Sequence, residues 1–249
     1  MTTSAKVIAI TGASRGIGAA IAIELASRGF TVACLTRKGS GPESPNVPEE
    51  AALRFVNCAC DVTDEESIRR ALADIAARSD GIHGLVNNAG IHLDAPSHAL
   101  TTALYEKVMA TNATAVFTTS REIYPHLLKA GGGIIVNIGS FYDKIGVKRN
   151  LAYCASKAAV GAMTRCLAVE WAAKGIRVVD IAPGYIETDL NREALTQGPL
   201  REFLAKRIPG GKSGSTADVA RLTAAIFSED IPFLTGATIY LDGGQGIAH

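Results

Sequence analysis

The chain has 249 residues, 47% of them hydrophobic and 20% charged, with a formal net charge of +1. This length is within reach of one large α/β domain, and the composition is typical of a globular protein rather than a disordered one. Basic residues are scattered along the chain, which excludes a general electrostatic attraction to nucleic acid or to an anionic membrane.

The N-terminal segment and the cysteines bear on the compartment of the protein. Thr11 and Gly12 interrupt the only apolar run near the N-terminus, which therefore lacks the core of a signal peptide. No run in the chain approaches the length needed to span a membrane. The five cysteines form no CxxC pair and have no histidine at ligand spacing. We therefore expect free thiols, no metal site and a cytoplasmic location.

Short apolar segments alternate with helical patterns along the chain. The predicted strands are Val7–Ile10, Thr31–Leu35, Phe55–Cys60, Gly84–Val86, Ile134–Ile138, Arg177–Ile181 and Thr238–Leu241. The predicted helices are Ile17–Arg28, 64–78, 101–129, 152–174 and 216–228. Nearly all-apolar strands that alternate with helices predict an α/β fold, in which helices cover both faces of a parallel sheet. We expect a single domain over residues 1–249.

A glycine-rich loop joins the first predicted strand to the first predicted helix. Glycines at positions 12, 16 and 18 let the backbone approach a pyrophosphate closely, and the helix N-terminus behind them offers free N–H groups. The alternative is an ordinary tight turn, but the position after the first strand favours dinucleotide binding. The expected contacts are Gly12, Ser14, Arg15, Gly16, Ile17 and Gly18.

The end of the second predicted strand bears on which cofactor is bound. An NAD site usually places an acidic residue there, whereas this chain has Thr36, Arg37 and Lys38. The planar guanidinium group of Arg37 is suited to a 2′-phosphate. We therefore predict NADP, with NAD as the second choice. The alternative is that Arg37 is an ordinary solvated residue.

Two segments interrupt the alternation of strands and helices. Lys38–Glu50 holds three prolines and two glycines, and it predicts a surface loop that leads into a short helical turn. Pro183–Gly214 is predicted to be irregular. We expect its part from Glu187 onward to close over the substrate as a mobile lid.

Tyr153 and Lys157 lie four residues apart on the predicted helix 152–174, so their side chains share one face. A free tyrosine has a pKa near ~10 and is a poor acid–base catalyst at neutral pH. Lowering this pKa to about 7 requires roughly 4 kcal/mol. An ammonium group at ~4 Å can supply this at an effective dielectric constant near 20. Such pairs are common on helices, so a catalytic interpretation depends on the rest of the chain.

Further polar motifs accompany this pair. Ser140 follows the predicted strand Ile134–Ile138, Asn112 lies in the helix before that strand, and residues 87–90 read NNAG. Each alone could merely cap a turn or satisfy backbone groups. With the glycine-rich loop, Asp61-Val62, and Pro183-Gly184 followed by Thr188, they stand in the order typical of the short-chain dehydrogenase/reductase family. The chain resembles that family over essentially its whole length.

This resemblance implies a Rossmann-type, doubly wound sheet of about seven parallel strands, with the cofactor over their carboxyl ends. It implies that Tyr153 is the general acid/base, and that Lys157 lowers its pKa and binds the nicotinamide ribose. Ser140 would hydrogen-bond the substrate oxygen, and Asn112 would help to hold a water molecule in a proton relay. The reaction implied is hydride transfer between NADP(H) and the carbonyl or alcohol carbon of a small molecule.

The resemblance also implies cofactor contacts outside the glycine-rich loop. Asp61 would meet the adenine, Asn88 would support the cofactor cleft, and Thr188 would touch the nicotinamide carboxamide together with Ile186. The full set of these further contacts is Asp61, Val62, Asn88, Ala89, Gly90, Pro183, Gly184, Ile186 and Thr188.

The substrate depends on the predicted loops 91–98, 141–150 and 185–214. Phe141, Tyr142 and Tyr185 offer aromatic walls. Charged residues at 143–149 would favour an anionic substrate if Lys144 or Arg149 faced the cleft.

The resemblance extends to 3-oxoacyl-[acyl-carrier-protein] reductases. Members of that group often carry an arginine just before the strand that leads to the serine, whereas residues 129–133 here read KAGGG. Dehydrogenases of sugar acids and other polyols are equally open interpretations. A catalytically silent dinucleotide sensor or structural protein of the same fold is the alternative of a different class.

Two features bear on assembly. Small residues on the predicted helix 152–174 allow a second helix to pack closely, and Thr238–Leu241 is predicted to be a sheet edge. Members of the family commonly form symmetric dimers or tetramers, so we expect a homotetramer, with a dimer second. The small residues are Ala155, Ala158, Ala159 and Ala162.

Overall fold

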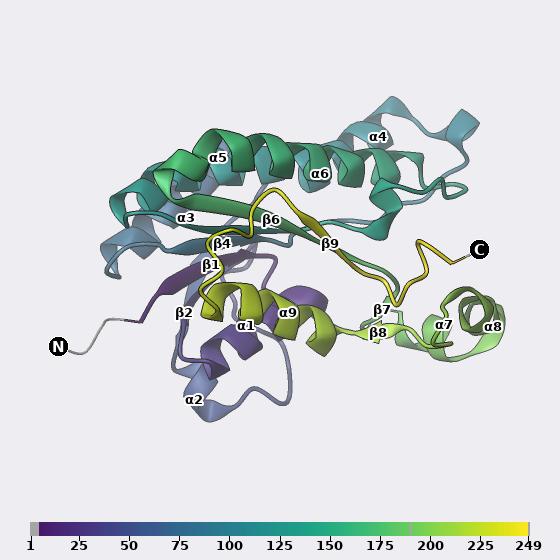
Figure 1. Ribbon diagram of the computed structural model, residues 1–249, viewed down its shortest axis with the longest axis horizontal. Helices are drawn as coiled ribbons and strands as arrows, with labels where there is room; N and C mark the ends of the chain where they lie inside the picture. Colours follow the sequence, from purple (N-terminus) through teal and green to yellow (C-terminus); the bar gives the residue numbers. More distant parts are fainter. Residues whose placement is uncertain (1–4, 190, 249) are drawn as a thin grey trace.

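All seven predicted strands join one parallel sheet. The structure is a computed structural model that describes residues 5–189 and 191–248 (Figure 1). The strand order is β3-β2-β1-β4-β5-β6-β9, and every neighbouring pair is parallel. This confirms the predicted α/β fold with a doubly wound, Rossmann-type sheet. The strands are β1 (Val7–Thr11), β2 (Thr31–Thr36), β3 (Phe55–Ala59), β4 (Gly84–Asn87), β5 (Gly133–Ile138), β6 (Ile176–Pro183) and β9 (Thr238–Leu241).

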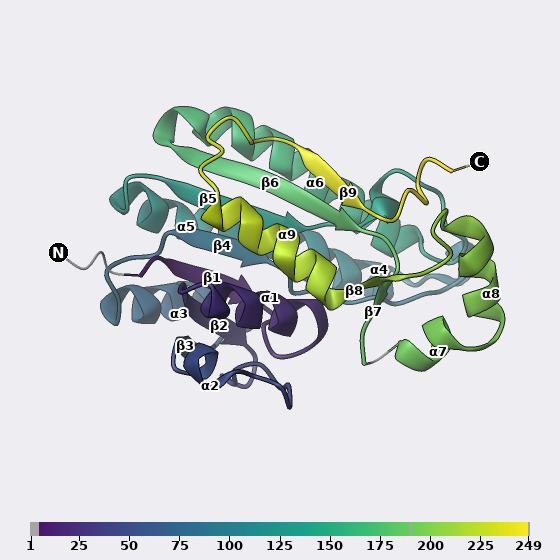
Figure 2. The same ribbon diagram turned by 60° about the horizontal axis from the view of Figure 1, so that its bottom comes forward.

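Helices cover both faces of this sheet, because its central strands are apolar on both sides. In β1, Ile8 and Ile10 pack in one core cluster, whereas Val7 and Ala9 pack in the other. The first cluster lies under α1 (Gly16–Ser27) and α9 (Thr216–Ser228), which run side by side in Figures 1 and 2. The second lies under α3 (Glu65–Ala77), α5 (Ala115–Lys129) and α6 (Leu151–Trp171).

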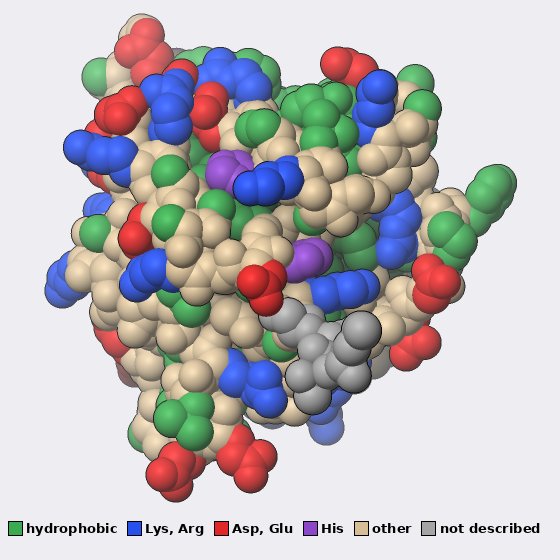
Figure 3. Space-filling view, turned by 90° about the vertical axis from the view of Figure 1, so that its left-hand side faces the viewer, with side chains coloured by type: hydrophobic (Ala, Val, Ile, Leu, Met, Phe, Trp, Pro, Cys, Tyr) green, Lys and Arg blue, Asp and Glu red, His purple; other side chains and the backbone are tan. Residues whose placement is uncertain are grey.

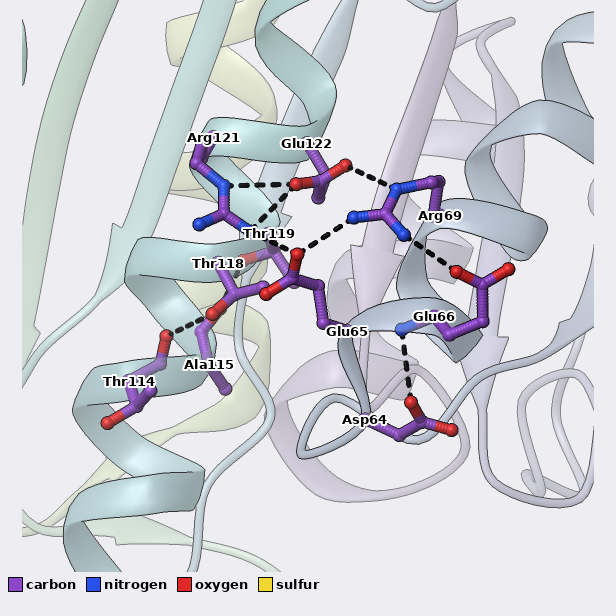
Figure 4. A network of polar contacts seen from close by, with 10 residues as sticks. All are labelled: Asp64, Glu65, Glu66, Arg69, Thr114, Ala115, Thr118, Thr119, Arg121 and Glu122. Carbon is purple, nitrogen blue, oxygen red and sulfur yellow. Dashed lines mark hydrogen bonds and ion pairs between the residues drawn. The ribbon is translucent and has the colours of Figure 1, made fainter.

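An ion-pair network joins α3 to α5 on the outside of the second layer (Figure 4). Arg69 of α3 contacts Glu122 of α5 at 3.2 Å and Glu65 at 2.8 Å, and Glu65 contacts Arg121 of α5 at 2.7 Å. The arginines are about half exposed, so each pair contributes little to stability. The network fixes how the two helices lie against each other rather than holding the fold together.

The predicted helix 101–129 contains an unpredicted π-helical turn. It begins as α4 (Thr102–Met109), passes through the π turn Ala110–Thr114, and continues as α5. Such a turn adds one residue to the helical repeat and occurs frequently at functional sites. Here it carries Asn112.

The segment Pro183–Gly214 is more regular than predicted. It contains α7 (Arg192–Thr196), α8 (Gly198–Arg207), and a small two-stranded sheet of β7 (Ile186–Glu187) and β8 (Gly214–Ser215). Its helices bury Leu195, Leu204 and Ile208 in a cluster of their own. The prediction was wrong because the segment has few apolar residues at helical spacing, whereas its glycines and charged residues are typical of a loop.

The remaining elements are short. The predicted turn after the loop 38–48 is found as α2 (Glu49–Ala52). Single 3₁₀ turns occur at Ser97–Ala99, Phe141–Asp143 and Ala172–Lys174. None of the helices in the described ranges is long and apolar enough to cross a membrane.

The carboxyl ends of the strands and the opposite end of the sheet have different surfaces. At the carboxyl ends of β1 and β4 the chain order reverses, and this is where ligands bind in open α/β sheets. Figure 3 shows the opposite end of the molecule, where acidic and basic side chains are interspersed. A surface depression there is lined by Lys6, His83 and Arg177, and it contains none of the predicted site residues.

Candidate active site

The glycine-rich loop after β1 forms a cradle without room for side chains. Gly12 and Gly16 have φ values of +67° and +56°, which favour glycine. A Cβ atom on Gly18 would lie 2.2 Å from the carbonyl oxygen of Gly12 and 2.4 Å from Nδ2 of Asn88. Because α1 begins at Gly16, its free N–H groups point to the same place. These features fit the pyrophosphate of a dinucleotide.

Asn88 and Thr11 join the end of β4 to this loop. The Asn88 side chain donates to the carbonyl oxygens of Thr11 and Gly12 at 3.0 and 3.1 Å. The buried Thr11 hydroxyl accepts hydrogen bonds from the backbone N–H groups of Asn88 and Ala89, both at 3.0 Å. Thr11 was not among the residues expected in the site. The feature that could have indicated it is a hydroxyl residue at the end of an otherwise apolar strand.

Arg37 and Asp61 meet at the carboxyl ends of β2 and β3. Hydrogen bonds from Thr63 lower the pKa of the Asp61 carboxyl group, and the charge of Arg37 adds to this effect. Arg37 is exposed. The loop after it packs on the cradle, because the backbone N–H of Glu43 donates to the carbonyl oxygen of Ser14 at 2.7 Å. The loop after β2, the glycine-rich loop and Asp61 thus come together from separate segments of the sequence.

Tyr153 and Lys157 lie on one face of α6, as predicted. Lys157 is 6% exposed, and its Nζ lies 5.6 Å from the centroid of the Tyr153 ring. This Nζ donates to the carbonyl oxygen of Ile138 at 2.7 Å. Burial lowers the pKa of Lys157 from 10.5 to about 8, although the charge of Asp180 acts against this.

Ser140 is the residue that contacts the Tyr153 hydroxyl. It is buried directly after β5, with an extended backbone, and its Oγ accepts a hydrogen bond from the backbone N–H of Tyr142 at 3.3 Å. Burial raises the pKa of Tyr153, and the hydrogen bond with Ser140 lowers it. The net upward direction differs from the sequence-based expectation, because burial outweighs the favourable interactions around the hydroxyl.

Asn112 lies in the π turn and forms hydrogen bonds to the backbone of Ile91 and to Ser156. It is 1% exposed, and its Nδ2 donates to the carbonyl oxygen of Ile91 at 2.9 Å and to Ser156 Oγ at 3.2 Å. Its Oδ1 accepts from the backbone N–H of Ile91 at 2.8 Å. Asn112 thus ties the chain after the NNAG motif to α6. Its expected part in a water-mediated relay stays a prediction.

Aromatic side chains line the approach to Tyr153. The ring centroids of Tyr142 and Tyr153 are 5.8 Å apart, and the hydroxyls of Tyr142 and Tyr185 are hydrogen-bonded at 2.8 Å. Phe141 packs behind both tyrosines. The sequence analysis missed His92, whose ring stands edge to face against Tyr153 at 4.9 Å and whose Nε2 contacts Asn150. A histidine two residues after NNAG was the available signal.

Two of the charged residues at 143–149, Lys144 and Arg149, have partners within the protein. Lys144 Nζ lies 3.4 Å from the ring centroid of Tyr240, on the edge strand β9. Arg149 forms an ion pair with Asp94 at 2.8 Å. Whether either charge faces the substrate stays a prediction.

The chain after β6 returns to the cradle. A Cβ atom on Gly16 would lie 3.6 Å from Cγ2 of Thr188, so Thr188 stands beside the glycine-rich loop. Pro183 ends β6, and a Cβ atom on Gly184 would lie 2.8 Å from Cα of Asp242. Of the other residues predicted to contact the cofactor, Ile186 is buried in the core under α9, Val62 packs against the α3 layer, and Gly90 adjoins Asn112.

Comparisons with known proteins agree with this geometry. Residues 12–245 match a family described as enoyl-(acyl carrier protein) reductase. The chain is 34% identical to D-threitol dehydrogenase of Mycolicibacterium smegmatis over 97% of this chain and 93% of that protein. It is 36% identical to a 3-oxoacyl-[acyl-carrier-protein] reductase of Haemophilus influenzae, over 96% of this chain and 97% of the other.

A solved structure gives the same result for the fold. The gluconate 5-dehydrogenase of Burkholderia cenocepacia, in complex with NADP and tartrate, superposes with a TM-score of 0.88 and is 30% identical. The match covers 99% of this chain and 97% of the other. With its cradle, its Ser140–Tyr153–Lys157 cluster and these full-length matches, the chain belongs to the short-chain dehydrogenase/reductase family of oxidoreductases.

Proposed function

We propose that the protein transfers a hydride between NADP(H) and the carbonyl or alcohol carbon of a small substrate, with Tyr153 as general acid/base. The observation that carries this proposal is the buried ammonium group of Lys157, whose Nζ lies 5.6 Å from the centroid of the Tyr153 ring on the same face of α6, with Ser140 acting on the Tyr153 hydroxyl. This cluster lies beside the dinucleotide cradle, at the carboxyl ends of the strands. The arrangement supports proton transfer at one oxygen atom of a substrate.

The protein's own residues handle the proton and the developing charge. The cradle, Thr188 and Lys157 would hold NADPH, which would supply the hydride in the reductive direction. Tyr153 gives its proton to the substrate oxygen, and Ser140 donates a hydrogen bond to the same atom as negative charge develops there. The Lys157 ammonium favours the phenolate that remains on Tyr153.

The aromatic wall supports an uncharged substrate that carries hydroxyl groups. The hydroxyls of Tyr142 and Tyr185 and the ring of His92 offer polar contacts near Tyr153, whereas Lys144 and Arg149 have partners within the protein. The relatives named above include enzymes for a polyol, a sugar acid and an acyl thioester. Of these classes, the polyol or ketose fits the wall best.

NADPH oxidation, followed at its absorbance band, tests the proposal. The panel holds a tetrulose or pentulose, a keto sugar acid and acetoacetyl-CoA, and the highest kcat/KM is expected for the uncharged ketose. Tight NADPH binding without turnover on the whole panel would contradict the proposal. It would favour a silent dinucleotide-binding protein of the same fold.

The segment from Glu187 to Gly214 is proposed to close over the substrate. Its two helices have their own small core, and β7 and β8 attach it to the domain where the chain leaves the cradle. In Figure 1, α7 and α8 project beyond the carboxyl ends of the strands. Leu190 of the proposed lid lies outside the described residues.

Hydrogen exchange measures this closure. Amide protection of α7 and α8 is expected to rise when cofactor and substrate are both bound, because closure excludes water from the reacting atoms. Peptides from α9 serve as the internal control. Equal protection of α7 and α8 with and without the ligands would contradict a lid.

A homotetramer is proposed for the assembly, with a dimer as the second choice. Ala158 and Ala162 lie on an exposed face of α6, where Val169 is 84% exposed, and β9 is the edge of the sheet. Phe233, before β9, is fully exposed. Such apolar surface favours a symmetric interface. Light scattering at micromolar concentration is expected to give four times the chain mass of 26.0 kDa, and a monomer mass would contradict the proposal.

A further inference from the structure

A buried carboxyl group lies beneath the candidate catalytic residues and has no part in the mechanism above. Asp180 is on β6, beside Asn137 of β5 and Thr238 of β9 in sheet register, and it is 1% exposed. A Cβ atom on Gly139 would lie 2.5 Å from Oδ1 of Asp180 and 2.8 Å from its Oδ2. The carboxyl group therefore fills the space that a side chain at position 139 would need, directly before Ser140.

The hydrogen bonds of this carboxyl group are incomplete. Thr238 Oγ1 donates to Oδ2 of Asp180 at 3.2 Å. The Oδ1 atom is buried without a hydrogen-bond partner among residues 5–189 and 191–248. A buried carboxylate with an unsatisfied oxygen is costly unless an opposite charge compensates it.

The opposite charge with the largest effect on Asp180 is that of Lys157, although the two side chains form no direct ion pair. The Nζ of Lys157 is held on the carbonyl oxygen of Ile138, the residue before Gly139. Burial raises the pKa of Asp180 from 3.8 to about 6, and the charge of Lys157 is the strongest influence against this. Burial likewise lowers the pKa of Lys157 to about 8, and Asp180 acts against it.

Other titratable groups near Asp180 come from the turn after β5, from β9 and from α6. Asp143 raises the pKa of Asp180, and it accepts a hydrogen bond from the Tyr240 hydroxyl at 2.9 Å. Burial raises the pKa of Tyr240 to about 12, with Arg165 acting against this, and Lys144 lies over the Tyr240 ring. Lys157 is thus the cation with the largest effect on Asp180, and the others act on Tyr240.

We propose that Asp180 is a positioning residue whose buried charge keeps Lys157 protonated beside Tyr153. A neutral residue of the same shape would leave the buried ammonium uncompensated, so Lys157 would lose its proton at lower pH. A neutral lysine would then stabilise the Tyr153 phenolate less. This consequence for Tyr153 rests on the proposed function, whereas the titration of Lys157 does not.

Carbon-13 NMR of lysine labelled at Cε measures the titration directly in the full chain. The Lys157 resonance is assigned by its loss in Lys157→Arg. In Asp180→Asn its midpoint is expected to fall by at least about one pH unit. Thr238→Val is the matched control, because it removes the hydrogen bond to Asp180 but keeps the charge. Its midpoint is expected to stay within about 0.3 units of wild type.

An unchanged Lys157 midpoint in Asp180→Asn, or an equal fall in Thr238→Val, would overturn the proposal. If Asp180→Asn does not fold, the reciprocal measurement decides. In Lys157→Met the carboxyl group of Asp180, followed by carbon-13 at Cγ, is expected to titrate at least about one unit higher than in wild type. An unshifted Asp180 midpoint would also overturn the proposal.

The pH dependence of kcat is a separate test. In Asp180→Asn the fall of kcat that follows loss of the Lys157 proton is expected about one pH unit lower than in wild type, which lowers kcat up to about tenfold on that limb. A fall at the same pH as in wild type would show that turnover does not depend on the charge of Lys157. Absence of turnover in wild type contradicts the proposed function, while the NMR titrations still decide the role of Asp180.

Discussion

Replacing Tyr153 with phenylalanine is expected to lower kcat by about 10²- to 10⁴-fold, the usual contribution of a general acid–base group. The change removes the hydroxyl that contacts Ser140, while the ring can keep its packing against His92 and Tyr142. Affinity for NADPH is expected to be nearly unchanged, because the cradle belongs to other elements. Steady-state kinetics with the best ketone and a fluorescence titration of NADPH measure the two effects.

Tyr124→Phe is the matched control for this prediction. Tyr124 lies on α5 and packs against Trp171 of α6, with ring centroids 4.8 Å apart, in the core cluster on that face of the sheet. It loses the same hydroxyl away from the candidate site, so kcat is expected to stay within about twofold of wild type. Full turnover in Tyr153→Phe would exclude Tyr153 as the general acid/base.

Replacing Arg37 with aspartate is expected to reverse the cofactor preference. Wild type should favour NADPH over NADH by at least about tenfold in kcat/KM, which corresponds to ~1.4 kcal/mol. The reason is that the guanidinium group can form two charge-assisted hydrogen bonds to the 2′-phosphate. In the variant, the carboxylate repels that phosphate and accepts hydrogen bonds from the ribose hydroxyls of NADH. Measuring kcat/KM with both cofactors gives the ratio for each protein.

Lys38→Asp makes the same change of charge at the next residue. Lys38 is also exposed, so a general electrostatic effect would shift the preference in both variants. A specific contact of Arg37 predicts a large shift only in Arg37→Asp. A wild-type preference for NADH, or an unaltered ratio in Arg37→Asp, would show that Arg37 does not select the cofactor.

Most of the fold could be predicted from the sequence, because strands and helices depend on local hydrophobic spacing. Every predicted strand is found, and α9 begins and ends as expected. The prediction failed between Pro183 and Gly214, where four short elements replace an irregular segment. The helices there are stabilised by a small cluster around Leu195, Leu204 and Ile208, whose spacing is too sparse to dominate a local pattern.

The candidate site, like the fold, could be predicted only in part from the sequence. Spacing along the chain was enough to place Tyr153 and Lys157 on one helix face, and the glycines of the cradle around the start of α1. It could not show which side chains from distant strands and loops would meet them. His92 beside Tyr153 and the hydroxyl pair of Tyr142 and Tyr185 appear only when the segments after β4, β5 and β6 come together.

The sequence by itself determined the order of the elements, the dinucleotide cradle and the catalytic candidates, because these depend on residue type and short-range spacing. The tertiary structure alone decided the charges around them. Lys144 lies over the ring of Tyr240, Arg149 pairs with Asp94, and Asp180 lies buried in the space beside Gly139. Burial also raises the pKa of Tyr153. Such effects depend on distance and desolvation between residues far apart in the chain, which no local pattern encodes.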